Sequence, residues 1–262
     1  MMRAMRKYAA FARMAMIRTR EERGELYGRV VFFAIVLGVF SSLWRAVAET
    51  GMPIAISPKA LVWYLAATEW ILLSAPPIHL DIQEALRRGD VVYQLGRPAS
   101  YVLAEFAAAL GLLAVRVPVL GVTAFVCAFA FTRWIPPLTA VIGIVPFALA
   151  ATTLITAMHL WIGLLAFWLH DVSPLYWVWQ KLLFVLGGLM LPLALYPVFI
   201  QRIAAVTPFP ALLGGPASIV LGSGSTRPMG LALDLVFWSG ATAVVVAWTF
   251  RRATSALTVN GG

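Results

Sequence analysis

Long apolar runs separated by short polar or proline-rich segments set the pattern of this 262-residue chain. A transmembrane helix needs about 20 mostly apolar residues, because each residue adds about 1.5 Å and the hydrocarbon core is about 30 Å thick. By this criterion we predict an all-α, polytopic membrane protein with about six transmembrane helices. The predicted spans lie at about 30–48, 59–76, 112–131, 142–168, 177–196 and 230–250.

The first 29 residues have a different pattern. They contain eight arginine and lysine residues, and apolar residues such as Met5, Tyr8, Ala12 and Met16 recur among them at helical spacing. This pattern predicts an amphipathic helix on the cytoplasmic membrane surface, with its cations toward the lipid headgroups. A disordered basic tail is the alternative. We therefore divide the chain into an interface helix, 1–29, and a transmembrane domain, 30–262.

Residues 78–98 form the largest charged island between predicted spans. Leu80, Ile82, Ala85 and Leu86 have the spacing of a short amphipathic helix that ends at Gly89. A rigid polar knob between two spans could receive force from a soluble motor. The residues of this helix that could do so are Asp81, Glu84, Arg87 and Arg88. An ordinary charged loop would have a similar composition, and periodicity leaves both interpretations open.

The segment 197–222, before the last span, is apolar but interrupted by prolines. Pro197, Pro208, Pro210 and Pro216 prevent a single transmembrane helix. Irregular backbone is tolerated at membrane depth only where protein or water covers it. We therefore predict short helices that dip into the outer leaflet as a re-entrant hairpin.

Composition and charge support a membrane location. Hydrophobic residues make up 61% of the chain and charged residues 12%, against about 25% charged in soluble domains. The net charge of +9 is explained by cations on the cytoplasmic side of membrane helices, so we expect no nucleic-acid partner. With both termini cytoplasmic, the inner set is Arg3, Arg6, Lys7, Arg13, Arg18, Arg20, Arg23, Arg29, Arg87, Arg88, Arg97, Lys181, Arg251 and Arg252, against Arg45, Lys59, Arg133, Arg202 and Arg227 outside.

Motifs for catalysis are absent from the sequence. It has no phosphate-binding loop with its lysine, no HExxH zinc motif and no G-x-S-x-G elbow. The sole cysteine, Cys127, lies in an apolar run, and His79, His159 and His170 lack a metal-ligand spacing. We therefore expect no catalytic residue, no metal and no cofactor in this chain.

Charged residues inside predicted spans are costly and are candidates for function. Glu69 lies deepest, in the second span, and could line a substrate path. Glu105, Arg116 and Asp234 lie nearer to span ends. The alternative for each is a position near the interface or a pairing between helices.

The charged island and several later motifs together resemble one known family. The stretch 86–98, LRRGDVVYQLGRP, is similar to the cytoplasmic signature of ABC-2-type permeases from the six-helix branch whose ATPases are separate chains. Further similarities in the same order are Lys7-Tyr8, Leu43-Trp44, Ala166-Phe167-Trp168, Leu191-Pro192-Leu193, Tyr196-Pro197, Pro208-Phe209 and Gly215-Pro216-Ala217. The sequence departs from the signature at Tyr93-Gln94 and at Gly96, which leaves the finer subfamily open.

The resemblance implies a permease subunit of an ABC exporter that moves an amphipathic lipid, glycan or drug-like substrate. It implies two ATP-binding partner chains that hold ATP and Mg²⁺, and a second permease chain, identical or homologous, in a bacterial cytoplasmic membrane. It adds Gly89, Asp90, Arg97 and Pro98 to the coupling residues, and it makes Tyr196, Pro197, Pro208, Phe209 and Pro216 candidates for a gate.

Two other functions remain open from the sequence. A membrane-embedded enzyme could act on a lipid-linked substrate at the cytoplasmic face, where Glu69, His79, Asp81, Glu84 and Asp90 gather. A non-catalytic anchor for other subunits is the second alternative.

Overall fold

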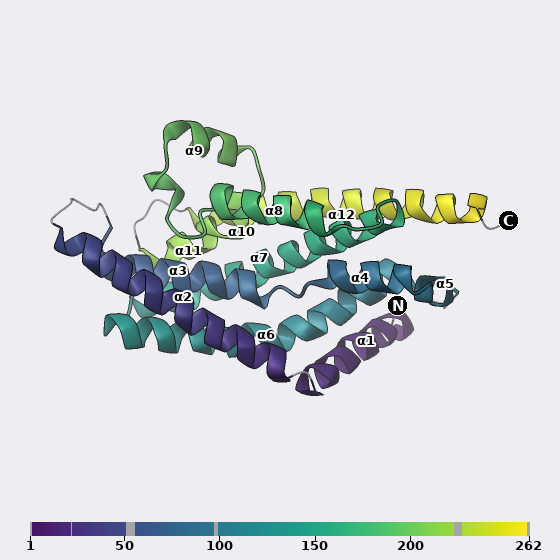
Figure 1. Ribbon diagram of the computed structural model, residues 1–262, viewed down its shortest axis with the longest axis horizontal. Helices are drawn as coiled ribbons and strands as arrows, with labels where there is room; N and C mark the ends of the chain where they lie inside the picture. Colours follow the sequence, from purple (N-terminus) through teal and green to yellow (C-terminus); the bar gives the residue numbers. More distant parts are fainter. Residues whose placement is uncertain (1, 22, 51–55, 97–98, 223–226, 261–262) are drawn as a thin grey trace.

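The computed structural model describes residues 2–21, 23–50, 56–96, 99–222 and 227–260. Over these residues the regular structure is helical, which confirms the all-α prediction (Figure 1). The helices are α1 (Met2–Glu21), α2 (Arg23–Glu49), α3 (Pro58–Ser74), α4 (Ile78–Arg87), α5 (Asp90–Leu95), α6 (Tyr101–Thr132), α7 (Leu138–Leu164), α8 (Ser173–Leu186), α9 (Val198–Ala205), α10 (Phe209–Leu212), α11 (Gly214–Val220) and α12 (Pro228–Asn260). Two 3₁₀ turns lie at Leu165–Phe167 and Leu193–Leu195.

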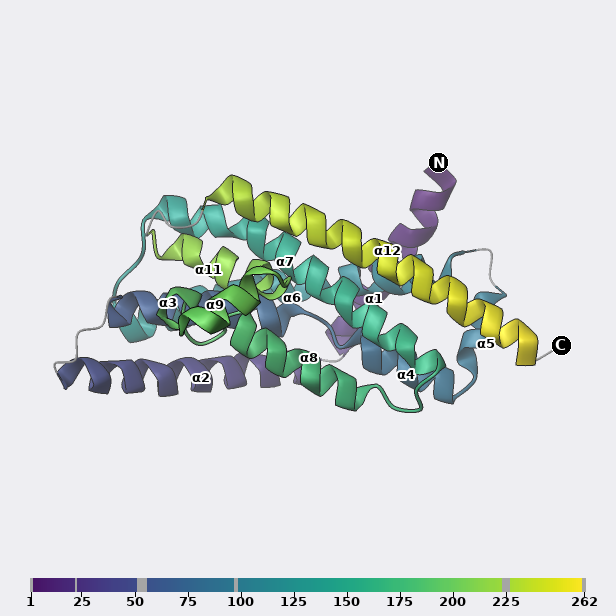
Figure 2. The same ribbon diagram turned by 90° about the horizontal axis from the view of Figure 1, so that it is seen from above.

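Five helical stretches are long and apolar enough to cross a membrane, counted over the described ranges. They are Gly24–Glu49, Pro58–Arg87, Tyr101–Thr132, Leu138–Phe167 and Pro228–Ser255. These stretches run along the long axis of the molecule in both ribbon views (Figures 1 and 2). The chain is therefore a polytopic membrane protein.

Helix α3 forms the centre of the bundle. Its residues are buried continuously from Leu61 to Glu69, and α2, α6, α7 and α11 pack around it. The outer helices instead expose large apolar side chains, such as Phe32, Val122 and Phe237. Because lipid tails are as apolar as these side chains, close packing rather than the hydrophobic effect holds such helices together.

The two ends of the bundle differ in content. The start of α1 and the end of α12 lie in the same half as α4 and α5, which we call the α4 end (Figures 1 and 2). The end of α2, the start of α3, α9 and α11 lie in the opposite half. The start of α1 and the end of α12 therefore lie in the same half of the molecule.

Several helix boundaries differ from the predicted ones. The region 1–29 is divided, because α1 ends at Glu21 and α2 begins at Arg23. The predicted third span is part of α6, which is continuous from Tyr101 and contains Pro118. Helix α7 likewise continues through Pro146. Prolines are tolerated within transmembrane helices when neighbouring groups re-satisfy the freed backbone carbonyls.

The predicted fifth span, 177–196, differs most from the structure. Helix α8 ends at Leu186, and the chain turns at Gly188, where φ is +67°. The carbonyls of this turn accept hydrogen bonds from α3, where Tyr64 Oη donates to Gly188 O at 2.6 Å and Thr68 Oγ1 donates to Leu189 O at 2.7 Å. A single helix over 177–196 is therefore not formed, because glycine conformation and side-chain donors stabilise an earlier stop.

The proline-rich segment after this turn forms three short helices, α9, α10 and α11, in agreement with the prediction of short helices there. Leu212, Leu213 and Ala217 are buried in the main core, and the Gly214 N–H donates to Gly187 O at 2.9 Å. Helix α9 projects from the bundle, while α10 and α11 lie closer to it (Figure 1). How deep these helices lie in the membrane remains a prediction.

Candidate functional site

Helix α4 is built by local signals around the charged island. Pro76 and Pro77 end α3 and place the start of α4 at Ile78. Asp81 lies in the first turn and Arg87 in the last, where their charges oppose the helix dipole favourably. Gly89, with φ +78°, ends the helix in a left-handed conformation that glycine adopts without steric cost. The predicted amphipathic helix in 78–98 is therefore present.

One face of α4 packs closely on α7. Ile78 and Ile82 are buried among Leu160 and Leu164 of α7. At Gly163 the two helices approach so closely that an added Cβ would lie 2.8 Å from Ile82 Cδ1 and 3.0 Å from His79 Cα. Glycine at this position permits the close contact. Helix α4 is therefore packed against the bundle and is not an ordinary charged loop.

Polar contacts attach α4 to the connection between α7 and α8. The Arg87 guanidinium donates from Nε and Nη2 to His170 O at 3.3 and 3.0 Å. The Val172 N–H donates to Gln83 Oε1 at 2.6 Å. In the same connection, the Ser173 hydroxyl and N–H donate to Asp171 and hold the pKa of that carboxyl below its ordinary value. Movement of α4 would therefore be transmitted to α8 as well as to α3.

The opposite face of α4 carries exposed charges. The predicted coupling residues Asp81, Glu84, Arg88, Gly89 and Asp90 are all exposed. A cavity of about 820 Å³ between α1, α4 and α6 has four of these residues, all but Gly89, in its wall. The pair Glu84–Arg88 is 2.8 Å long, and at such exposure it contributes little to stability.

The remaining predicted coupling residues are Arg87, Arg97 and Pro98. Arg87 is exposed, yet its guanidinium is bound to the His170 carbonyl, so it holds α4 in place. Arg97 and Pro98 lie outside the described residues. Leu80, predicted on the apolar face of this helix, is instead exposed, and with the exposed Tyr93 it adds apolar groups to the same end. An exposed surface of mixed charge and apolar character at the end of a rigid helix is suited to docking a protein partner.

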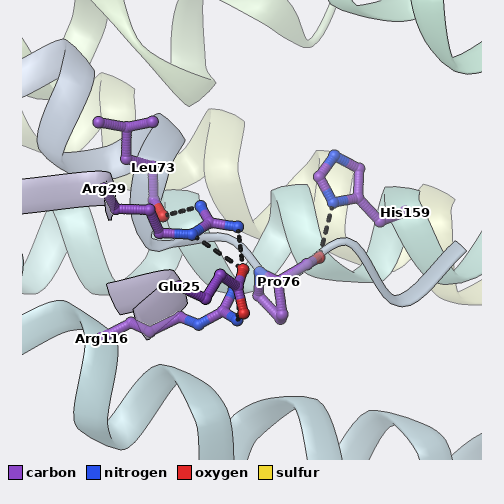
Figure 3. Close-up of polar contacts among 6 residues, drawn as sticks. All are labelled: Glu25, Arg29, Leu73, Pro76, Arg116 and His159. Carbon is purple, nitrogen blue, oxygen red and sulfur yellow. Dashed lines mark hydrogen bonds and ion pairs between the residues drawn. The ribbon is translucent and has the colours of Figure 1, made fainter. Parts of the chain in front are cut away.

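The break between α3 and α4, Ala75–Pro77, is held by side chains from two other helices (Figure 3). Arg29 of α2 donates from Nη1 to Leu73 O at 2.6 Å. His159 of α7 lies with Nδ1 3.0 Å from Pro76 O. A carbonyl only accepts hydrogen bonds, so His159 carries a proton on Nδ1. These donors satisfy carbonyls that the end of α3 leaves without helical partners.

An ion pair between the buried Arg116 and the exposed Glu25 joins the same region to α6. Arg116, whose side chain is 6% exposed, donates from Nη2 to both carboxylate oxygens of Glu25 at 3.1 and 3.0 Å. Glu25 also accepts from Arg29 at 2.9 Å (Figure 3). Removing Glu25 would take this carboxylate from the buried Arg116 guanidinium, which is where the cost of breaking the pair would arise. Arg116 therefore pairs between helices, one of the alternatives that the sequence left open.

Sequence reasoning missed a buried aromatic cluster at this level. His79 and His159 have ring centroids 5.3 Å apart, and Tyr176 stacks on His79 at 4.0 Å. Trp179 completes the cluster at 4.8 Å from His159. These residues come from α4, α7 and α8, so no spacing in the sequence indicated their proximity. Over the described part of the chain, no group of three or more potential metal ligands is found.

The predicted pathway residues are not brought together with the coupling residues. Glu69 is 6% exposed within α3. Phe209 and Pro216 are buried, and Phe209 packs on Trp179 with ring centroids 6.5 Å apart. Tyr196 and Pro208 are half-buried, and Pro197 is exposed. Their roles in a pathway or gate remain predictions.

Comparison with known proteins gives one match. The family model described as "ABC-2 family transporter protein" matches residues 67–261, which include α4, α5 and all later helices. No curated protein and no solved structure matches the chain.

Proposed function

The chain belongs to the ABC-2 family of transporter proteins, and we propose that it is the permease subunit of an exporter driven by a separate ABC ATPase. The cargo that we propose is an amphipathic molecule of the lipid, glycan or drug-like kind. The membrane subunit would supply the path across the bilayer, and ATP and Mg²⁺ would be bound by the partner chain.

The observation that carries this proposal is the construction of α4. Its outer face bears Asp81, Glu84 and Arg88, and its inner face is fixed to α7 through the close contact at Gly163. A motor can transmit force only through an element that does not yield locally. Helix α4 meets this requirement, because it is short and packed and is also bound through Gln83 and Arg87 to residues 170–172.

The route of the force follows from the contacts. A push on α4 reaches α3 across the break at Ala75–Pro77, and it reaches α8 through the bonds to His170 and Val172. Because α3 is surrounded by four other helices, its displacement changes the packing of the whole bundle. ATP binding would bias the bundle toward one state through its differential affinity for the two states of the motor.

The proposed assembly places the α4 end in the cytoplasm of a bacterial cell, with the chain in the cytoplasmic membrane. Two ATPase chains would bind there, one to each of two permease chains. Arg87, Arg88, Arg251 and Arg252 belong to this end, as the excess of cations on the cytoplasmic side of membrane proteins would require. The hairpin of α9 to α11 would lie at the outer face, where it could act as a lid.

The test is to purify the tagged chain from its native membrane in mild detergent and to identify what accompanies it. We expect an ABC ATPase whose hydrolysis rate in proteoliposomes rises with cargo. The double variant Arg87→Ala/Arg88→Ala should insert normally and lose this stimulation. The swapped pair Glu84→Arg/Arg88→Glu keeps the internal ion pair but presents its charges in reverse order, so it should also lose stimulation.

The matched control is Arg252→Ala, which removes a cation at the same end but outside α4. It should keep the stimulated hydrolysis rate. Normal stimulation in both α4 variants would refute the coupling role of α4. Activity of the isolated chain on a lipid-linked substrate, with no ATPase present, would favour the membrane-enzyme alternative.

A further inference from the structure

A second hollow lies away from the coupling helix, between α6 and α12. It has a volume of about 500 Å³, within the range of about 300–1,000 Å³ usual for ligand pockets. Leu103 and Phe106 of α6 form one wall, and Ala243 and Ala247 of α12 form the other. The short alanine side chains leave the space open, and the buried Leu154 and Leu160 of α7 lie beneath it. We call this hollow the α6–α12 groove.

The length of the groove along α12 is close to the thickness of one leaflet of the bilayer. Along α12 it extends from Arg251 to Ser239, which is about 18 Å at about 1.5 Å per residue. Half of a hydrocarbon core is about 15 Å. At the end away from Arg251, the groove is lined by two polar residues, Ser239 of α12 and Thr153 of α7. An acyl chain that enters at Arg251 would therefore reach the bilayer midplane where the groove ends.

The end of the groove toward the α4 end of the bundle, which we call its mouth, carries a positive charge. Arg251 lines it together with Ser100, the N-cap of α6. Phe250, stacked on Tyr101 at 6.1 Å, lies beside it. The exposed Trp248 is one turn away and carries Arg252 over its ring at 5.5 Å. Tryptophan and arginine at one level are typical of the membrane–water interface, which is where phosphate groups of lipids lie.

From this apolar slot with a cation at its mouth we infer a binding site for one anionic phospholipid. The acyl chain lies between α6 and α12, and the Arg251 guanidinium donates to the lipid phosphate, a bond strengthened by the opposite charges. On the proposed orientation the mouth opens to the cytoplasmic leaflet, which is rich in anionic lipids. The site depends on the membrane fold alone, so it stands whether or not an ATPase partners the chain.

Native mass spectrometry of the full-length protein in its purified assembly tests the site. Phosphatidylglycerol and phosphatidylcholine with matched acyl chains are titrated separately, and bound lipid per chain is counted. We expect one phosphatidylglycerol per chain, with an apparent Kd about tenfold lower than that of phosphatidylcholine, because the choline cation of phosphatidylcholine offsets the charge of its phosphate. Arg251→Gln should abolish this preference. Arg252→Gln should keep it, because Arg252 stacks on Trp248 and does not line the groove.

A filling variant separates the acyl slot from the headgroup contact. Ala243→Leu/Ala247→Leu places bulk in the groove from exposed positions, so it should reduce binding of both lipids while the protein stays folded. Unchanged phosphatidylglycerol binding in Arg251→Gln, or equal binding of the two lipids by the natural sequence, would overturn the site. So would rapid disulfide formation between two chains that carry Ala247→Cys in a Cys127→Ser background, since a second chain would then occupy the groove.

Discussion

Helices α8 and α3 both end inside the bundle, at what we call the α8 stop and the α3–α4 break. The backbone carbonyls freed at these two places are bound by different kinds of side chain. At the end of α8, the free carbonyls of Gly188 and Leu189 are bound by Tyr64 and Thr68, two neutral hydroxyls one turn apart on α3. At the α3–α4 break, the carbonyls of Leu73 and Pro76 are bound by Arg29 and His159, which come from different helices. Both stops satisfy the requirement that buried backbone groups have partners.

The difference lies in what each stop connects. The α8 stop joins its carbonyls to a single rigid helix through two neutral hydroxyls, so it fixes α8 to α3. The α3–α4 break joins three helices through long or titratable side chains, and it sits beside the helix proposed to receive force. We therefore expect the α8 stop to contribute mainly to stability, and the α3–α4 break mainly to coupling between ATP hydrolysis and transport.

The largest effect on stability is expected from the double variant Tyr64→Phe/Thr68→Val. It leaves Gly188 O and Leu189 O without these donors, and two orphaned buried carbonyls should lower the free energy of unfolding in mixed micelles by about 2–4 kcal/mol. ATP hydrolysis per folded complex should remain coupled. Thr123→Val is the control, because the Thr123 hydroxyl is exposed and bonds a carbonyl of its own helix. A loss below about 1 kcal/mol would show that the end of α8 does not depend on the donors Tyr64 and Thr68.

Gly163→Ala should have the next largest effect. The new methyl group would press on Ile82 and on the backbone of His79, and such overpacking costs about 1–3 kcal/mol. It should also displace α4 and reduce cargo-stimulated ATP hydrolysis. Gly143→Ala on the same helix is the control, since its Cβ would lie 3.8 Å from Ile219, an ordinary contact. If both variants behave alike, the close approach of α4 to α7 has no role in coupling.

Arg29→Met should lower the free energy of unfolding less than Tyr64→Phe/Thr68→Val does, but it should weaken the coupling of ATP hydrolysis to transport more. It removes the donor to Leu73 O and one cation from Glu25, a loss of about 1–2 kcal/mol after allowance for the 20% exposure of the Arg29 side chain. The ratio of cargo moved to ATP hydrolysed should fall several-fold. Arg45→Met, at the far end of the same helix, removes only a bond to Ser41 O within α2 and should leave that ratio unchanged.

The smallest change in stability is expected from Glu84→Gln. The exposed pair with Arg88 contributes at most about 0.5 kcal/mol to stability, so thermal unfolding should barely shift. Its effect on stimulated ATP hydrolysis should nevertheless exceed that of the Tyr64→Phe/Thr68→Val variant. Glu49→Gln, an exposed carboxylate at the opposite end, is the control. The reverse order of the two effects would contradict the proposed division between the stops.

The sequence was sufficient to predict elements whose signals are local. Apolar length predicted the long helices, and Gly89 predicted the end of α4. It was insufficient where distant residues decide the outcome. The stop at Leu186 depends on donors more than 100 positions earlier, Tyr64 and Thr68, because only a folded α3 can offer them to α8. Periodicity of the apolar run therefore favoured a longer span.

The same limitation applies to the candidate site. The exposed face of α4 could be predicted, because charge and helical spacing are visible along the chain. Its attachments could not, because Arg87 and Gln83 bind backbone groups near residue 170, and any residue type offers such groups. The pairing of Arg116 with Glu25 joins positions 91 apart and likewise has no sequence signal. A backbone group is the same in every residue type, so a sequence motif cannot indicate that Arg87 or Gln83 will bind it.

The unequal lengths of the helices bear on how bilayer thickness acts on the protein. Helix α3 has 17 residues, about 26 Å, which is shorter than a hydrocarbon core of about 30 Å, and its neighbours shield it from lipid. Helices α6 and α12 have 32 and 33 residues, and both face outward. A thinner or thicker bilayer must therefore change the tilt of α6 and α12 while α3 keeps its own surroundings. Acyl-chain length thus becomes a mechanical variable that acts on the shell of the bundle independently of its axis.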